Sequence, residues 1–480
     1  MANLSPTPRT TRSGRRFSSM VDWGTVQPVV CPPNFSLSPL LKQAIEFNSD
    51  GCTEAFDFGG TTVLNLPLDA KRPASDINPV QPSGSPQKKV KRSHVHRRKK
   101  RNQRVVQDGH QAAAKAATAR TLCDLVEEAA QTTVQVAIQL ESLPASSCGY
   151  RAKSKGSSKP GVHAVEYYKN LGYSVLKNDG SKTFPLIDSS TGRVFAVVVG
   201  KPKDDPTFDL CCEGAFEAMK HTRQTETFNY DETHHPRGHY AVINTGITRG
   251  PGSGTPCNLN NGSHSNAVEK LLCNTHICRL ATYASAAFSV WAPDLFQYYK
   301  AHLDPLMQKE NHLKKNFEKS IFTSAAFNLG PNVCTLSHRD CMNCPFGWCA
   351  IQSLGQFDHT LGGHLVLEDL KLLVEFPPGC LILIPSAVLT HANTPIQVGE
   401  MRASFTQYCA GALFRYVDNN FMTQDEFRAS VTGEEFEAKM KEKETRWKKG
   451  LELFSTLDDL VERAKAFADQ MEKTVEEGQV

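Results

Sequence analysis

After residue 320 the chain consists of short apolar segments separated by turn residues, and this pattern constrains the fold more than any other feature. The separators contain Gly, Pro, Asp or Asn, as in LGPN, FPPG and PSA. Several short strands at close spacing are typical of a sandwich or a jelly-roll barrel. The expected strands cover residues 322–329, 349–355, 363–367, 371–376, 380–385, 388–393 and 402–409.

The preceding part of the chain mixes helical and strand patterns. The expected elements are helices at 163–171 and 212–223, strands at 193–200 and 239–247, and a long apolar helical stretch at 265–301. The last stretch should break before Pro293, because proline disrupts a helix interior. Together the patterns predict an α+β domain over 162–423, with a double-stranded β-helix (jelly-roll or cupin-like) core flanked by helices.

Residues 1–107 differ in composition from the rest of the chain. They are rich in Pro, Ser, Thr and Asn and carry 17 Lys and Arg residues against 7 Asp and Glu residues. No sustained period of 2 or 3.6 is present, so this region is predicted to be disordered and basic. The block KKVKRSHVHRRKKRNQR (88–104) holds ten basic residues and no acid. It predicts a nuclear-import signal that can also attract nucleic-acid phosphates, and the alternative is a plain solvated charge run.

The segments on either side of the predicted domain are expected to be helical. Residues 108–161 should form a helix and a linker, because 111–143 is Ala-rich and RAKSKGSSKPG (151–161) has the composition of a linker. The tail 424–480 carries 10 basic and 15 acidic residues and opens on the capping-box pattern TQDE. It is predicted to continue as a charged amphipathic helix on the surface or packed against the domain.

Composition and the N-terminal sequence predict a nuclear or cytosolic protein. No run of 18 or more apolar residues exists, so no membrane partner is expected. The segment MANLSPTPRTTRSGRR lacks the apolar core of a secretory signal. In such a compartment the 15 cysteines should be mostly free thiols. Together with the basic block, these features predict nuclear localisation.

Two histidines and an aspartate in the strand-rich region form a candidate metal centre. His338 and Asp340 alternate along one segment, and His391 follows 53 residues later in another expected strand. Alternating residues of an extended segment point to the same face, so His338 and Asp340 can reach one ion. Two imidazoles and one carboxylate leave half of an octahedron open, which suits Fe(II) that must bind an oxo-acid and O₂. A structural zinc site would be closed by four ligands.

The context distinguishes this motif from a second one with the same spacing. His302 and Asp304 lie in a helical pattern, where residues two apart point to different sides. Downstream of His391, Arg402 and Ser404 share one face of an expected strand. An arginine beside a hydroxyl can hold the distal carboxylate of 2-oxoglutarate, and the alternative is a salt bridge at the rim of the barrel.

Cysteines near the motif raise a zinc alternative. Cys341 and Cys344 form a CxxC pair, with Cys349 close behind. No second CxxC follows at the spacing of a zinc finger, so a finger is not expected. A second set that could share an ion in space consists of Cys257, Cys273 and Cys278.

The segments HRDCMN (338–343) and RASFTQY (402–408) resemble the TET/JBP family of nucleic-acid-base dioxygenases. The chain looks closest to the Tet-like 2OG-Fe(II) oxygenases expanded in mushroom genomes. This likeness is strongest over 322–423, through PFGWCAIQSLGQFD, DLKLLVEFPPGCLILIPS and RASFTQYCAGALFRYVDN. It extends less sharply back to about residue 165, and the first 150 residues are not covered.

The resemblance implies roles for particular residues. His338, Asp340 and His391 match the family's iron ligands, while Arg402, Ser404 and His364 match residues that hold 2-oxoglutarate. Asn343 and Tyr408 match residues that hydrogen-bond and stack on the target base; the plain alternatives are a turn residue and a core aromatic. Ala410 stands where animal members have a base-contacting histidine, and their Cys-rich zinc-binding region is not evident. Those departures bear on which base is bound and how DNA is held.

The predicted function follows from the motif and the resemblance together. The chain is expected to oxidise the methyl group of a modified base, first of all 5-methylcytosine in DNA, with Fe(II), 2-oxoglutarate and O₂ as cofactors. The alternatives are an N6-methyladenine DNA demethylase, a dioxygenase acting on RNA or protein, and a non-catalytic nuclear nucleic-acid-binding protein. Methylated DNA is the expected partner, and the pattern says nothing of the oligomeric state.

Overall fold

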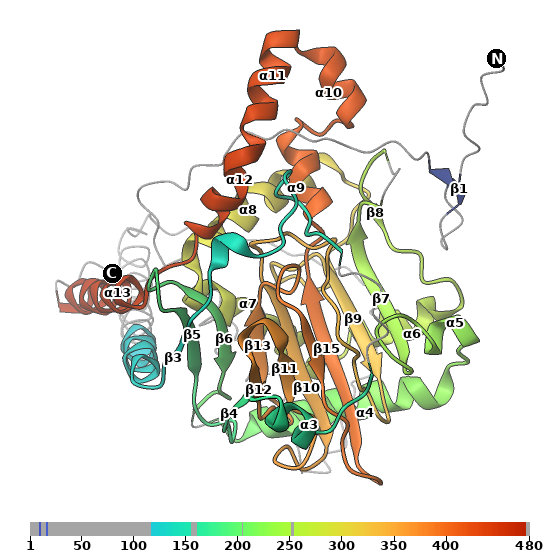
Figure 1. The fold of residues 1–480 in the computed structure, drawn as a ribbon, viewed down its shortest axis with the longest axis vertical. Coiled ribbons are helices and arrows are strands. Elements are labelled where there is room, and N and C mark those ends of the chain that lie inside the picture. Colours follow the sequence, from blue (N-terminus) through green and yellow to red (C-terminus); the bar gives the residue numbers. More distant parts are fainter. Residues whose placement is uncertain are drawn as a thin grey trace, which may run out of the picture.

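Two β-sheets form the centre of the fold, with helices around them (Figure 1). The computed structural model describes residues 9–10, 16–17, 117–154, 161–203, 205–250 and 254–476. Within these residues the fold is α+β, as predicted. The expected import signal at 88–104 lies outside the described residues.

The larger sheet has nine strands and contains most of the expected segments. Its order is β3-β5-β6-β13-β10-β15-β9-β7-β8, and every neighbouring pair is antiparallel except β3 and β5. The strands are β3 (Val134–Val136), β5 (Phe184–Asp188), β6 (Val194–Val199), β13 (Leu381–Ile384), β10 (Cys349–Gln356), β15 (Met401–Tyr408), β9 (Ser324–Leu329), β7 (Ala241–Thr248) and β8 (Cys257–Asn258). A separate antiparallel pair joins β1 (Arg9–Thr10) to β2 (Arg16–Phe17).

The smaller sheet has four strands and shares a core with the larger one. Its order is β14-β11-β12-β4, formed by β14 (His391–Asn393), β11 (Leu365–Leu367), β12 (Leu372–Val374) and β4 (Ser174–Leu176). One apolar cluster contains Leu365 and Val374 of this sheet together with Ile382 and Ala350 of the larger sheet. After residue 320 the chain therefore passes back and forth between two sheets that enclose a common interior.

Helices α4 (Thr207–Thr225), α6 (Ser265–Leu272) and α7 (Thr275–Trp291) pack against the larger sheet. The buried face of α4 includes Phe208, Ala215 and Met219, spaced so that they lie on one side of a helix. The long expected helix is interrupted twice. It breaks before Pro293, as predicted, where α8 (Pro293–Lys309) begins, and again where Asn274 caps α7 by accepting from the Ile277 amide.

The remaining helices cover the edges and one end of the sheets. They are α3 (Val165–Asn170), α5 (Tyr230–Thr233), α9 (Gly411–Asp418), α10 (Gln424–Ser430), α11 (Gly433–Lys441), α12 (Lys443–Leu451) and α13 (Leu457–Glu476), with 3₁₀ turns η1 (Leu140–Ser142), η2 (Gly262–His264) and η3 (Glu368–Leu370). The capping box predicted at Thr423 and Glu426 is confirmed. None of the helices in the described part of the chain combines the length and the apolar character needed to cross a bilayer.

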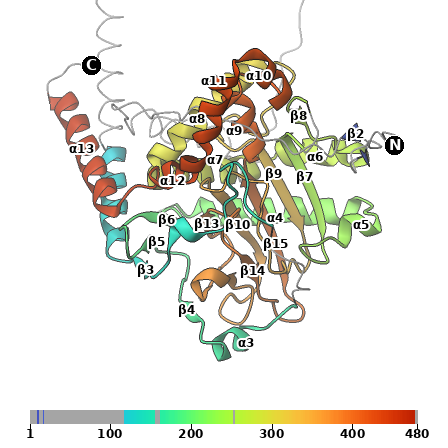
Figure 2. The ribbon, with the colours of Figure 1, turned by 45° about the horizontal axis from the view of Figure 1, so that its top comes forward.

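The described parts of the N- and C-terminal flanks pack on the domain instead of forming separate units. The helix over 117–130 and α13 lie side by side in both views (Figures 1 and 2). Arg120 pairs with Glu472 between them, and both helices contribute to the main apolar cluster. The expected boundary at residue 162 does not separate structural units, because β3 pairs with β5. The expected single tail helix is four helices, since turns interrupt it.

The second His-x-Asp motif has a packing role. His302 is fully buried on α8, its Nδ1 lies 2.7 Å from the Tyr298 carbonyl oxygen, and its Nε2 lies 3.0 Å from Asp418 Oδ1. The Tyr150 hydroxyl donates to Asp418 Oδ2 at 2.6 Å. The network joins the segment before the domain to α8 and α9. Asp304 takes no part in it.

We expect His302→Ala to lower the free energy of unfolding by about 3–5 kcal/mol, because Asp418 would stay buried without its imidazole partner. Urea denaturation at neutral pH measures the change. The control is His221→Ala at an exposed position of α4, which should shift the free energy by less than about 0.5 kcal/mol. Equal effects of both variants would contradict this account of the network.

Candidate metal centre

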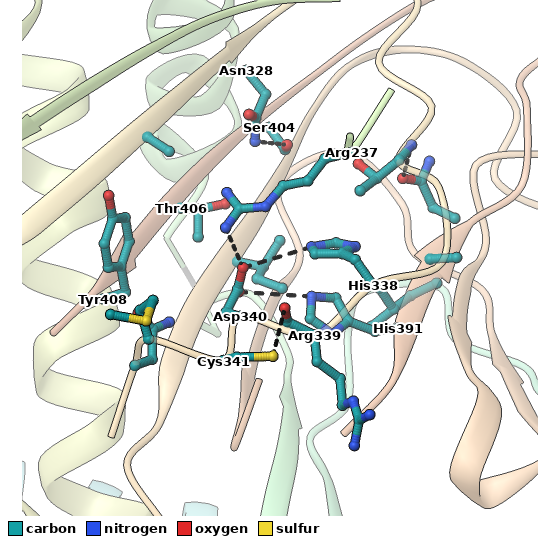
Figure 3. Close-up of a pocket in the computed structure, with 18 of the residues that line it drawn as sticks. Arg237, Asn328, His338, Arg339, Asp340, Cys341, His391, Ser404, Thr406 and Tyr408 are labelled. Atoms are coloured by element: carbon teal, nitrogen blue, oxygen red, sulfur yellow. Dashed lines mark hydrogen bonds and ion pairs between the residues drawn. The ribbon is translucent and has the colours of Figure 1, made fainter. Parts of the chain in front are cut away.

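A β-bridge brings the two candidate histidines together. His338 and His391 pair as antiparallel partners, and each backbone amide donates to the other residue's carbonyl oxygen at 3.0 Å. The ring centroids are therefore only 4.3 Å apart. Asp340 follows in the same segment, with Oδ1 3.7 Å from His338 Nε2 and Oδ2 3.9 Å from His391 Nε2 (Figure 3). One ligand atom of each residue lies within 4.8 Å of the others.

The second nitrogen of each imidazole is held by the backbone. His338 Nδ1 lies 2.8 Å from the Leu336 carbonyl oxygen, and His391 Nδ1 lies 2.9 Å from the Leu389 carbonyl oxygen. A carbonyl oxygen only accepts, so each Nδ1 carries the hydrogen in a neutral ring, leaving Nε2 a free lone pair. Metal-binding histidines are commonly oriented in this way. Both lone pairs face Asp340, so the three groups fit a divalent cation.

The protonation states of His338 and Asp340 also favour a cation. The pKa of His338 is lowered from its usual 6.5 to about 3, mainly by burial and then by the neighbouring His391. Burial would raise the pKa of Asp340, but Arg237 and the two histidines outweigh burial and lower it to about 2. At neutral pH His338 is therefore a neutral ligand and Asp340 an ionised one.

These shifts predict how the stability of the metal-free protein depends on pH. Between about pH 6.5 and pH 3 the unfolded chain takes up a proton on His338 that the folded chain does not, so stability falls as the pH is lowered. Between about pH 3.8 and pH 2 the unfolded chain also takes up a proton on Asp340, so the stability falls further. His338→Asn should reduce the slope of the free energy of unfolding against pH between about pH 6.5 and pH 3, by up to about 1 kcal/mol per pH unit. Urea denaturation across this range tests it, and an unchanged slope would contradict it.

The three groups open into a cavity of about 420 Å³ between the two sheets. One wall is a single face of β15, where Arg402, Ser404, Thr406 and Tyr408 alternate toward the interior. The opposite wall includes Leu365 of β11 and His391 of β14. A volume of this size is in the usual range for burying small organic ligands.

Arg402 is a buried cation inside this cavity without an acidic partner among the described residues. Its side chain is 2% exposed, one guanidinium nitrogen donates to the Val333 carbonyl oxygen at 3.0 Å, and Nε has no hydrogen-bond partner. Burial lowers its pKa to about 10. Ser404 lies on the same face and accepts a hydrogen bond from Asn328 Nδ2 at 2.9 Å. A salt bridge at the barrel rim, the alternative considered for Arg402, is not formed within the described part of the chain.

The structure adds Arg237 to the centre, a residue that the sequence patterns did not single out. Its guanidinium lies 2.6 Å from Asp340 Oδ1, and its side chain is about half exposed (Figure 3). Arg237 precedes the strand expected at 239–247, and no local pattern distinguishes it from any other loop arginine. Only the packing of β7's leading turn against the 334–340 segment brings it to Asp340.

The remaining predicted residues divide between the cavity and its surroundings. Asn343 and Tyr408 both line the cavity, and Asn343 Nδ2 donates to the Ser386 hydroxyl at 3.3 Å. Burial raises the pKa of Tyr408 to about 12, so its hydroxyl is neutral. His364 is buried but is not among the residues that line the cavity, whereas its neighbour Leu365 is.

No zinc cluster of cysteines forms within the described residues. There the triad of His338, Asp340 and His391 is the one group of three or more possible ligands that converge. Cys344 and Cys349 are fully buried, and burial raises the pKa of both thiols. Cys341 donates instead to the Lys153 carbonyl oxygen at 3.4 Å.

Comparison with known proteins gives low similarities. No family model and no curated protein sequence matches the chain. A solved structure described as NgTET1 in complex with 5mC DNA is 14% identical; the match covers 56% of this chain and 89% of that one, with a TM-score of 0.37. An oxidoreductase of the 2OG-Fe(II) oxygenase family from Burkholderia pseudomallei is 12% identical over 53% of this chain and 91% of that one, with a TM-score of 0.24.

Proposed function

We propose that the chain is an Fe(II)- and 2-oxoglutarate-dependent dioxygenase that oxidises the methyl group of a modified nucleic-acid base. The favoured substrate is 5-methylcytosine in DNA. One observation supports this above all: a His-Asp-His cluster opens into a cavity that also contains Arg402, a buried arginine with no acidic partner among the described residues. The passage of the chain between two sheets supports the double-stranded β-helix that such enzymes use.

His338, Asp340 and His391 would hold Fe(II) through two imidazole nitrogens and one carboxylate oxygen. Iron held there would, with 2-oxoglutarate and O₂, supply the oxidising chemistry needed to hydroxylate a methyl group. Arg402 would bind the distal carboxylate of 2-oxoglutarate, which gives its buried guanidinium the anionic partner it otherwise lacks. Ser404 adds a hydroxyl on the same face of β15.

The substrate would enter beside Tyr408 and Asn343. Tyr408 offers a ring face for stacking, and Asn343 offers an amide held in place by Ser386. Ala410 is bridged to Asn343 and also lines the cavity. A base inside a duplex cannot reach a buried ion, so the base must be flipped out or single-stranded. We also propose that the basic block at 88–104 directs the protein to the nucleus and adds salt-sensitive affinity for DNA.

The test is oxidation of defined oligonucleotides. Purified protein is incubated with Fe(II), 2-oxoglutarate, ascorbate and DNA bearing 5-methylcytosine or N6-methyladenine, and the nucleosides are analysed by mass spectrometry. The expected result is a gain of one oxygen on 5-methylcytosine, with stoichiometric succinate. A gain of oxygen on N6-methyladenine or on methylated RNA, without one on 5-methylcytosine, would identify that base as the substrate instead. Succinate formed only with histone peptides would point to protein, and no succinate with any substrate would refute the enzymatic proposal.

A further inference from the structure

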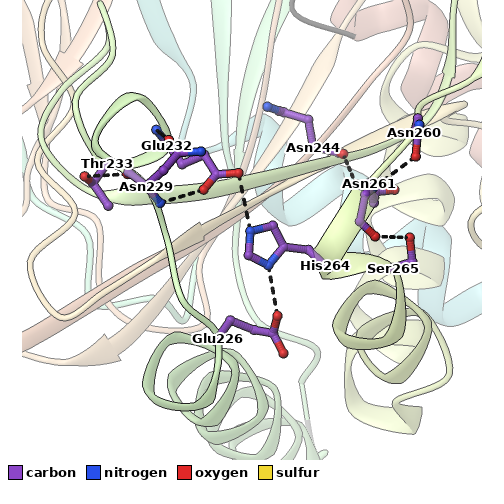
Figure 4. A network of polar contacts seen from close by, with 10 residues as sticks. Glu226, Asn229, Glu232, Thr233, Asn244, Asn260, Asn261, His264 and Ser265 are labelled. Carbon is purple, nitrogen blue, oxygen red and sulfur yellow. Dashed lines mark hydrogen bonds and ion pairs between the residues drawn. The ribbon is translucent and has the colours of Figure 1, made fainter. Parts of the chain in front are cut away.

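Away from the cavity, His264 lies buried between two glutamates (Figure 4). Its side chain is 8% exposed, with Nδ1 2.9 Å from Glu226 Oε2 and Nε2 3.4 Å from Glu232 Oε1. The Nδ1 contact is a hydrogen bond, in which the ring donates because a carboxylate oxygen only accepts; the Nε2 contact is a close approach to the Glu232 carboxylate without a hydrogen bond. Phe228 stacks on the imidazole at 4.8 Å, and the Arg223 guanidinium lies 5.3 Å from the Phe228 ring. We call this buried ring between the carboxylates of Glu226 and Glu232 the His264 clamp.

The clamp links three elements: the end of α4, α5, and the start of α6. Glu226 directly follows α4, Glu232 lies in α5, and His264 ends η2 just before α6. The α5 helix has four residues, too few to be stable without tertiary contacts. Glu232 also completes the capping box of α5, because its Oε2 accepts from the Asn229 amide at 2.8 Å. One carboxylate thus both starts α5 and attaches it to His264.

The turn after α5 packs directly on the segment that carries the candidate metal ligands. His235 and Gly238 close the turn with two backbone hydrogen bonds. The Leu336 amide, two residues before His338, donates to the Arg237 carbonyl oxygen at 2.8 Å. The approach at Gly238 is close: a Cβ there would lie 2.6 Å from the Cys334 carbonyl oxygen.

We propose that His264 is a positioning residue for the metal centre. By holding Glu226 and Glu232 together, it fixes the turn around Arg237 against the segment that leads into His338 and Asp340. This inference rests on the proposed function in one respect, namely that a cation binds at the triad. A pre-ordered ligand segment binds a cation more tightly than a mobile one, because less conformational entropy is lost on binding. His264 itself touches neither ion nor substrate.

The test uses Glu232→Gln, which removes the charge facing His264 yet keeps a residue type that completes capping boxes. We expect affinity for Mn²⁺, used as the probe ion, to fall about ten-fold, at the low end of the range for outer-sphere residues. Hydrogen exchange at the Leu336 amide should become faster. The matched control is Glu435→Gln, the same change in the capping box of α11, where the carboxylate accepts from the Thr432 amide at 2.8 Å. That variant should match the wild type in both measurements.

A double variant tests whether the effect passes through the turn. Gly238→Ala should push the turn away from Cys334, since the new Cβ would overlap a backbone oxygen. If His264 acts through this contact, Glu232→Gln should add almost nothing to the loss of Mn²⁺ affinity caused by Gly238→Ala. The inference would be overturned if the double variant lost Mn²⁺ affinity by the product of the two single-variant losses. It would also be overturned if Glu232→Gln had the Mn²⁺ affinity and the Leu336 exchange rate of the wild type. A wild-type chain that binds no Mn²⁺ would refute the proposed function, while Leu336 exchange would still decide whether the turn depends on the clamp.

Discussion

Asp340→Ala should abolish succinate formation and weaken Mn²⁺ binding by more than about 100-fold, which exceeds the usual effect of losing an outer-sphere residue. Asp340 is the only acid among the three converging ligands, and its two oxygens face both imidazoles. Without it, two neutral nitrogens remain beside the positive charge of Arg237. Titration with Mn²⁺ and a succinate assay measure the two losses.

The chain supplies its own control for this variant. Asp304→Ala removes the acid of the other His-x-Asp pair, which lies on α8 and belongs to no cluster of converging ligands in the described residues. It should leave both measurements unchanged. Asp340→Ala should still fold, because its partner Arg237 is half exposed and can be hydrated. Undiminished Mn²⁺ binding by a folded Asp340→Ala protein would exclude the triad as the metal centre.

Arg402→Met should raise the KM for 2-oxoglutarate by about 10- to 100-fold, which corresponds to the 1.5–3 kcal/mol typical of a hydrogen bond to a charged group. The reason is that no other cation among the described cavity residues is buried so completely. Mn²⁺ affinity without 2-oxoglutarate should not fall, since Arg402 contacts none of the three ligands. Initial rates at varied 2-oxoglutarate concentration measure the change.

Arg402→Lys is the matched variant, because it keeps the charge and loses the planar fork that binds a carboxylate through two parallel hydrogen bonds. Its KM should fall between those of the wild type and Arg402→Met. The melting temperature of metal-free Arg402→Met should not fall, since the guanidinium is buried without an acid in the described structure. A large loss of stability with an unchanged KM would make Arg402 a structural residue instead.

Local patterns predicted most of the elements that surround the centre. The expected helix at 212–223 is part of α4, and the expected strands at 239–247 and 402–409 are β7 and β15. The period of the apolar residues was sufficient to predict these elements, because each of them buries one whole face or is buried throughout. β3 (Val134–Val136) was missed because it lies within the Ala-rich segment 111–143, which was expected to be helical.

The outcome for the candidate site differs from residue to residue. Arg402, Ser404 and Tyr408 share a face in the structure because they alternate along one strand, which is a local property. His364 was assigned by resemblance, and in the structure its neighbour Leu365 lines the cavity while His364 does not. Asp340 does not lie in a strand; the His338–His391 bridge and the hydrogen bond from the Asp340 backbone amide to the Ser386 carbonyl oxygen hold its segment in place.

The amino-acid sequence alone determined the kinds of groups available and their spacing within each segment, because strand and helix periods are set by the local backbone. The tertiary structure alone decided which distant segments meet. It placed His338 beside His391, aimed Arg237 at Asp340, and left Arg402 buried without an acid. Such meetings depend on the pairing and packing of segments far apart along the chain, and no local period encodes them.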